Sequence, residues 1–298
     1  MAKKRDIVIA VIIIFSFAVT IGFFGLMFFS AFFGADDGSI GGFGERIAVV
    51  EVFGTISNSE PTVKQLKKYG QSESIKAIIL HVDSPGGGVA ASQEIYDEIL
   101  RIREEEGKTV VVSMSSTAAS GGYLIACAAD TIMANPGTLT GSIGVILQYP
   151  TVGRLFEKIG VKYETVKSGE LKDVGNFTRD MTVREREMLE AMIKDTYEQF
   201  VDIVCAGRGL DRDSVYKIAD GSIFSGRQAQ QLGLVDTLGG FEDAVRMTAK
   251  MVGISGEPKI VKEIRPKRGV WDLVGSLLGQ VDETASGEIG GPRIMYLY

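Results

Sequence analysis

The chain has 298 residues, a net charge of −6 and 45% hydrophobic residues, the composition of a folded protein with room for a large enzyme core. Its basic residues form no broad cluster, which excludes nucleic acid as a partner. Two cysteines without CxxC spacing predict neither a metal site nor a disulfide, and a Ser-His-Asp triad would have only His81 to use.

Residues 7–33 are uncharged and almost wholly apolar, and they exceed the roughly 20 residues that span a bilayer. The stretch is longer than the apolar part of a cleaved signal peptide, so we predict a transmembrane helix. Basic residues within residues 1–6 and acidic residues after the stretch predict a cytoplasmic N-terminus and an extracytoplasmic body. Residues 34–45, rich in glycine and aspartate, are predicted to form a flexible linker.

From residue 46 the chain alternates short β-branched runs with amphipathic stretches, which predicts βα units around a sheet and an α/β fold. We predict strands at residues 47–52, 77–82, 110–114, 131–134, 145–147, 163–166 and 234–236. We predict helices at residues 63–69, 90–105, 120–129, 152–159, 183–206, 214–219, 227–232 and 241–251. The longest helix is predicted to begin with a capping box of Thr182 and Glu185 and to end at Gly207.

Two glycine-rich sites, residues 83–88 and residues 118–123, each follow a predicted strand, where α/β proteins hold reactive groups. Ser120 opens a predicted helix, so its hydroxyl would face a substrate at the positive end of the helix dipole. The amide of Gly121 is placed to donate to a developing oxyanion, and Gly87 is the candidate for a second donor. Taken alone, a glycine after a serine in such a turn is also common in purely structural turns.

Further motifs follow these two in order along the body of the chain. The full set lies at residues 83–88, 118–123, 138–144, 167–173 and 221–236. Together the motifs resemble the signal peptide peptidase family of membrane-anchored Ser-Lys proteases, in its short single-length form. The resemblance implies that Ser120 is the nucleophile, Lys172 the general base and Ser142 the residue that orients the lysine. It also implies that Gly87 and Gly121 are the oxyanion donors, and that neither a cofactor nor a metal takes part.

The chemistry of such a pair is physically reasonable, because a neutral amine can take the serine proton and return it to the leaving amine. A lysine is protonated in water at neutral pH, so the base requires a buried amine. Without the family, Lys172 between Glu170 and Asp173 would be interpreted as a salt-bridged surface lysine. His81 is expected to pack on its strand. The S-x-x-K match that begins at Ser214 lacks the partner motifs of penicillin-binding proteins.

The resemblance implies a Clp protease/crotonase-like fold of repeated ββα units for a protease domain at residues 46–280. A short chain of this family is expected to form a homo-oligomer in which neighbouring subunits share each dyad. This oligomer would lie at the cell membrane and degrade remnant signal peptides and other apolar, membrane-derived peptides. The tail at residues 281–298 has an apolar end, and we hypothesise that this end occupies a neighbouring groove as product or inhibitor.

Three other functions stay open. A stomatin-associated membrane protease has a similar Ser-Lys dyad but cleaves a specific partner. A crotonase-like acyl-CoA enzyme would use the same glycine amides to polarise a thioester, although an extracytoplasmic position argues against coenzyme A. A membrane scaffold would keep the fold without catalysis, and the presence of both Ser120 and Lys172 argues against it.

Overall fold

The computed structural model describes residues 16–17, 19–22, 45–263 and 294–297. The chain divides into two compact units, Met1–Phe43 and Gly44–Tyr298. The described residues of the first unit are helical, and the rest of the predicted anchor at residues 7–33 lies outside the described residues. Among the residues that are described, none of the helices is both long and apolar enough to cross a membrane.

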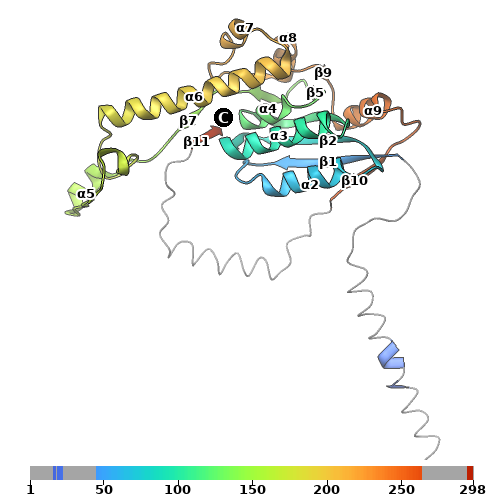
Figure 1. Cartoon of the computed structure of the whole chain (residues 1–298), viewed down its shortest axis with the longest axis horizontal. Helices are drawn as coiled ribbons and strands as arrows, with labels where there is room; N and C mark the ends of the chain where they lie inside the picture. The colour runs from blue at the N-terminus through green and yellow to red at the C-terminus, as the bar shows by residue number, and fades with distance from the viewer. Residues whose placement is uncertain (1–15, 18, 23–44, 264–293, 298) are drawn as a thin grey trace, which may run out of the picture. The chain divides into compact units, whose positions relative to one another are not determined.

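A largely parallel sheet forms the centre of the second unit (Figure 1). Its strands are β1 (Arg46–Phe53), β2 (Ile75–Ser84), β4 (Thr109–Ala119), β5 (Thr131–Ala134), β6 (Leu139–Gly141), β8 (Ile223–Ser225), β9 (Thr237–Leu238) and β10 (Lys259–Lys262). The main path runs in the order β10-β1-β2-β4-β5-β9, while β6 pairs with β4 and with β8. In this sheet the β6–β8 pair is antiparallel and the other described pairs are parallel.

Both faces of the sheet are buried, because a strand that is covered on two sides needs apolar residues at successive positions. On β1, Ala48 and Val50 join the larger core, whereas Ile47 and Val49 join the smaller core on the opposite face. The larger core contains residues of α2 (Glu60–Gly70), α3 (Val89–Glu104), α4 (Gly121–Ala126), α6 (Val183–Arg208), α7 (Arg212–Tyr216) and α8 (Gly226–Gln231). The smaller core contains residues of α9 (Phe241–Met251).

A second, three-stranded sheet lies beside the first. It consists of β3 (Gly86–Gly88), β11 (Ile294–Leu297) and β7 (Ile146–Leu147), with β11 in the middle and antiparallel to both neighbours. Figure 1 shows β11 beside β7 and close to the ends of α3 and α4. The sequence predicted no element in this tail, so the strand β11 is a correction to that expectation.

The segment between β7 and α6, which we call the arm, extends away from the sheet. It carries α5 (Gly153–Ile159) and a short 3₁₀ helix, η1 (Glu170–Asp173), and Figure 1 shows α5 at the far end of α6 from α4. None of the residues of α5 is buried. The arm therefore lacks a core of its own in the single chain.

The capping box that begins α6 is confirmed, since Thr182 accepts from the amide of Glu185 and the Glu185 side chain accepts from the amide of Thr182. The predicted end at Gly207 is wrong, because α6 continues to Arg208 and Gly209 forms the left-handed cap. Gly207 serves packing instead. A Cβ atom at this position would lie 2.3 Å from the carbonyl oxygen of Cys127, so only glycine allows the two backbones to meet.

The other predicted elements are largely confirmed, from β1 through α9. Two predicted strands are wrong. Residues 163–166 are exposed and form no strand, although their composition favours one, because no neighbouring strand pairs with them. Residues 234–236 precede β9 instead of forming it. The short strands β3, β6 and β8 were not predicted, because glycine and polar residues in three-residue strands leave no periodic pattern.

Candidate active site

The register of two parallel strands brings Ser120 and Ser142 to the same edge of the sheet. Strand β4 pairs with β6 so that Ala119 is opposite Gly141, and each strand is followed at once by one of the two serines. The amide of Ser120 donates a hydrogen bond of 2.8 Å to the carbonyl of Gly141. Residues 22 positions apart in the sequence therefore become neighbours at the carboxyl end of the sheet, where α/β proteins place ligands.

Both serines have a strained backbone. Ser120 has φ 53° and ψ −117°, Ser142 has φ 50°, and these two are the residues other than glycine with positive φ among those described. Such a conformation costs about 1–3 kcal/mol and is concentrated at functional sites. The Ser120 side chain is fully buried, and its Oγ has no hydrogen-bond partner in the described part of the chain. A buried hydroxyl without a partner is a chemically unusual and costly arrangement.

Helix α4, which follows Ser120, is anchored on every side. All six of its residues are buried, and the hydroxyl of Tyr123 donates a 3.0 Å hydrogen bond to the carbonyl of Leu234. Burial raises the pKa of Tyr123 well above its ordinary value, so the phenol stays a donor. Thr140 Oγ1 donates to the carbonyl of Ala118 at 2.7 Å, which ties β6 to the strand before Ser120. The serine is thus held on a rigid support.

A strand of three glycines lies next to this edge. Ile56 binds both Gly86 and Gly88, since its amide donates to the Gly86 carbonyl and its carbonyl accepts from the Gly88 amide. Alternate residues of a strand direct their polar groups to opposite sides, so the amide and carbonyl of Gly87 face β11. A Cβ on Gly87 would lie 2.2 Å from the Ile56 carbonyl oxygen, which only glycine avoids.

A side chain from the first motif also holds the end of β4. Asp83 Oδ1 accepts a 3.0 Å hydrogen bond from the amide of Thr117, close to the shift in register between β2 and β4. The amide of Gly121 belongs to the first turn of α4, where amides lack partners within the helix. The two predicted oxyanion donors therefore both carry backbone amides that are available to a ligand.

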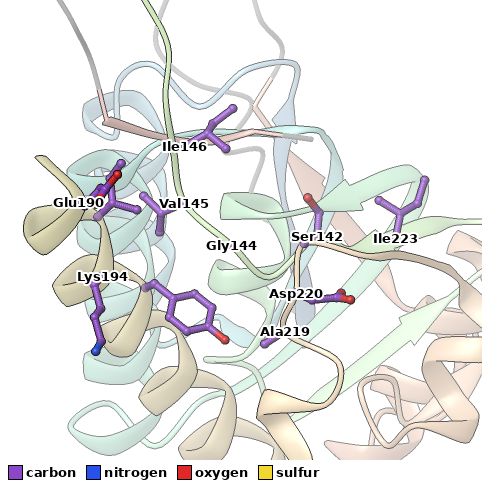
Figure 2. A pocket seen from close by; sticks show the side chains of 12 residues that line it. Ser142, Gly144, Val145, Ile146, Glu190, Lys194, Ala219, Asp220 and Ile223 are labelled. Carbon is purple, nitrogen blue, oxygen red and sulfur yellow. The ribbon is translucent and has the colours of Figure 1, made fainter. Parts of the chain in front are cut away.

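A cavity of about 650 Å³ opens beside Ser142 and continues along β7. Its lining is mostly apolar and consists of Ser142, Gly144, Val145, Ile146, Glu190, Ile193, Lys194, Tyr197, Ala219, Asp220, Gly221 and Ile223. Figure 2 shows Ser142 and Asp220 on one side of the cavity and Glu190 and Lys194, on α6, on the other. The volume is that of a typical small-ligand pocket.

The α6 residues of this cavity were missed by the sequence analysis, which interpreted the apolar stripe of the helix as core or subunit contact. A signal was present, because positions 190, 193, 194 and 197 follow the i, i+3, i+4, i+7 spacing of one helical face. The face is distinguished by two charged residues and a tyrosine among its members, a mixture that suits a pocket wall better than a core.

Lys172 lies in η1 on the arm, and the structure does not bring it to Ser120 within one chain. Figure 1 places α4 far from the arm. The Lys172 side chain is exposed. It makes no ion pair within the described part of the chain, whereas Glu170 pairs with Arg184 and Asp173 pairs with Arg179. The interpretation of Lys172 as a salt-bridged surface lysine is therefore not what the structure shows.

A buried ion cluster fixes η1 to the start of α6. Arg179 donates to both Asp173 and Glu185, and Lys167 also pairs with Asp173. The Arg179 guanidinium, with the capping bonds of Thr182, lowers the pKa of Glu185 to about 2. Arg179 and Lys167 hold the pKa of Asp173 well below its usual range. The position of Lys172 relative to α6 thus depends on charges whose partners come from three segments.

Two other candidates have structural roles. The His81 ring packs between Phe53, at a centroid distance of 5.3 Å, and Phe241, at 4.8 Å, and burial lowers the pKa of His81. This agrees with the packing role expected for His81. Ser214 donates from Oγ to Asp211, which caps α7, so the S-x-x-K match has a local structural explanation.

Comparison with known proteins adds to this geometry. The model of peptidase family S49 matches residues 102–255, and the Clp protease model matches residues 45–139. A Synechocystis protein whose name assigns it to the proteases is 44% identical over 211 residues, which cover 70% of this chain and 76% of that protein. Protease 4 of Haemophilus influenzae is 38% identical over 70% of this chain. The chloroplastic Serine protease SPPA of Arabidopsis thaliana is 32% identical over 82% of this chain.

The parallel sheet, the strained serine and the glycine strand define an α/β protein of the Clp-protease-like class. The chain belongs to peptidase family S49, the signal peptide peptidase family. The matched region makes up only 35% of the Haemophilus protein and 38% of the Arabidopsis protein, so these relatives are much longer than the part that they share with this chain.

The strain at Ser120 predicts an unusual order of stability. Replacing Ser120 by alanine removes a buried hydroxyl without a partner, and replacing it by glycine also relieves the positive φ. We expect the free energy of unfolding to rise from wild type to S120A and again to S120G, by about 1 kcal/mol at each step. Denaturant unfolding of the three proteins measures this order. A glycine variant less stable than the alanine variant would contradict the strain.

The ion cluster predicts a second effect on stability. Arg179→Ala leaves the Glu185 carboxylate, which is 1% exposed, without its cation, and we expect a loss of about 2 kcal/mol at pH 7. The matched control Arg184→Ala breaks an exposed pair and should cost about 0.5 kcal/mol or less. Because the folded-state pKa of Glu185 is lowered, its contribution is present above the unfolded pKa of about 4.3 and is lost as the pH falls toward 2. Unfolding measured from pH 7 to pH 3 should show the difference between wild type and Arg179→Ala shrinking; a constant difference would contradict the assignment.

Proposed function

We propose that this protein is a membrane-anchored serine endopeptidase that degrades remnant signal peptides and other apolar, membrane-derived peptides. The observation that carries the proposal is the strained, buried Ser120 beside Ser142 and beside the amides of Gly87 and Gly121. This arrangement suits attack on a carbonyl group, because the nucleophile and two oxyanion donors meet at one sheet edge. Membership of the family supports the same reaction class.

In the proposed reaction, Ser120 Oγ attacks the carbonyl carbon of the scissile peptide bond while its proton passes to the neutral amine of Lys172. The oxyanion accepts hydrogen bonds from the amides of Gly87 and Gly121. The protonated lysine then gives its proton to the leaving amine, and the acyl group stays on Ser120 as an ester. A water molecule, deprotonated by the lysine, hydrolyses the ester and restores the serine. Ser142 orients the amine throughout.

We further propose that Lys172 reaches Ser120 from a second copy of the chain. In one chain Lys172 is exposed on the arm, whereas a general base needs a buried amine. The arm also carries exposed apolar side chains, including Leu155, Ile159 and Val166, which a neighbouring subunit would cover. Docking of the arm would therefore bury both the apolar surface and the lysine. The result is a homo-oligomer with one dyad at each contact between subunits.

The proposed substrates follow from the cavity and from the two strand edges beside it. A peptide in extended conformation between β3 and β7 would form an antiparallel strand with each. Directly opposite residues of an antiparallel pair share a face of the sheet, so the peptide residue opposite Ile146 faces the cavity that Ile146 lines. The mostly apolar lining favours an apolar side chain there. An anchor at residues 7–33 would hold this site outside the cytoplasm, close to membrane-derived peptides.

The proposal is tested with the full chain in detergent and a fluorogenic apolar peptide. We expect S120A and K172A each to lower the cleavage rate by at least about 10³-fold. In an equal mixture of the two variants, dissociated and re-assembled, a contact is functional only when the intact serine meets the intact lysine. Two independent chances of one half predict recovery of about one quarter of wild-type activity in a closed ring.

The control for this experiment is Lys162→Ala, which removes an exposed lysine of the same arm and should leave cleavage unchanged. Two inactive variants without recovery in the mixture would place the dyad within one chain and overturn the shared site. Wild-type cleavage by either single variant would overturn the Ser-Lys assignment itself.

The cavity predicts a change in side-chain preference. Ile193→Trp adds bulk to the α6 wall of the cavity, so peptides with leucine or phenylalanine at the cavity-facing position should be cleaved about tenfold less efficiently relative to those with alanine. Comparison of kcat/KM over a peptide series that varies one position at a time measures this preference. The neighbouring Met192→Trp, at a position outside the lining of the cavity, is the matched control and should keep the wild-type preference. Equal preferences in both variants would show that the cavity is not a substrate site.

A further inference from the structure

The strand β11 of this chain occupies the place that the proposed function gives to a substrate. It pairs antiparallel with the glycine strand β3, with Met295 opposite Gly88, Tyr296 opposite Gly87 and Leu297 opposite Gly86. On its other side Ile294 and Met295 pair with Leu147 and Ile146 of β7. A peptide strand held at two edges in this way has all the backbone partners that an extended substrate would need.

The direction of β11 leads toward the nucleophile. From Met295 to Leu297 its partners run backward from Gly88 to Gly86, so the strand proceeds toward Ser84. Ser84 is paired with Ala118 in the large sheet, two residues before Ser120, and its carbonyl oxygen lies against Gly122 of α4. Contacts between β11 and α4 agree with this direction. The end of the strand is thus aimed at the start of α4, where Ser120 forms the N-cap.

Burial of the nucleophile is consistent with an occupied site. Ser120 is 0% exposed, so a peptide could not reach its Oγ while this arrangement persists. A substrate strand that binds β3 also requires the polar groups of Gly87, and these already face Tyr296 of β11. The tail and a substrate therefore exclude one another.

We propose that the C-terminal strand Ile294–Leu297 is an internal competitive inhibitor that fills the peptide groove between β3 and β7. The inference rests on the proposed peptidase function, because it assigns the same groove to substrate and tail. A segment that is tethered to its own binding site acts at an effective concentration of about 1 mM for a short flexible linker. Even a weak strand contact then outcompetes a dilute peptide, while a concentrated or tightly bound substrate displaces the tail.

The test compares Tyr296→Pro with Tyr296→Phe in the full chain. Directly opposite residues in an antiparallel pair exchange both backbone hydrogen bonds or none, so the amide of Tyr296 faces Gly87. Proline removes this donor and disturbs the strand, whereas phenylalanine keeps the amide and the ring. With a dilute fluorogenic apolar peptide, we expect kcat/KM to rise about fivefold in Tyr296→Pro and in a chain that ends at Ile289, with Tyr296→Phe unchanged.

A second measurement does not depend on catalysis. Amide hydrogen exchange at Gly86–Gly88 and Ile146–Leu147 should be faster in Tyr296→Pro than in Tyr296→Phe, because the pairing with β11 is lost. Equal exchange in the two variants would overturn the proposal, as would unchanged kcat/KM in chains whose cleavage depends on Ser120. If no variant cleaves peptide but exchange differs as expected, strand binding stands and the peptidase function fails instead.

Discussion

The parallel pairing of β4 with β6 is the constraint on which the site depends. Because Ala119 is opposite Gly141, the residues that follow must both leave the sheet at the same level, and the hydrogen bond from Ser120 to Gly141 holds them there. The chain makes this exit with two left-handed serines, at a cost in backbone energy. A slip in register by one residue would separate the serines and direct α4 differently. Tyr123, Thr140 and the glycine strand all support this one junction.

The arm follows a different physical logic from the sheet. The sheet is held by apolar packing on two faces, whereas the arm is attached to α6 through Arg179 and the carboxylates of Asp173 and Glu185. Charged hydrogen bonds specify orientation well and contribute little apolar burial. The arm thus presents Lys172 in a defined place while its apolar side chains stay uncovered. This is the expected condition of a segment whose packing partner is another molecule.

Much of the fold could be predicted from the sequence, because buried parallel strands read as continuous β-branched runs and the long helices carry caps and faces. Helix α9 is reproduced residue by residue and the capping box at Thr182 is as predicted. What escaped prediction depends on contacts distant in sequence. The strands β3, β6 and β11 exist through their pairing partners, and Gly207 continues a helix because Cys127 approaches it, not because of its own propensity. The candidate serine was found from its glycine-rich turn, but its proximity to Ser142 required the register.

The glycine strand β3 has a consequence for how this enzyme could change over evolutionary time. Three successive glycines offer a bound peptide only main-chain atoms, and Gly87 cannot acquire a side chain without collision with Ile56. One wall of the groove is therefore fixed, and it cannot distinguish one amino-acid sequence from another. Selectivity can drift only through the opposite wall, at β7 and the face of α6, where Ile146, Ile193 and Tyr197 are free to vary. Descendants of such a chain would share how they grip a peptide while differing in which peptides they prefer.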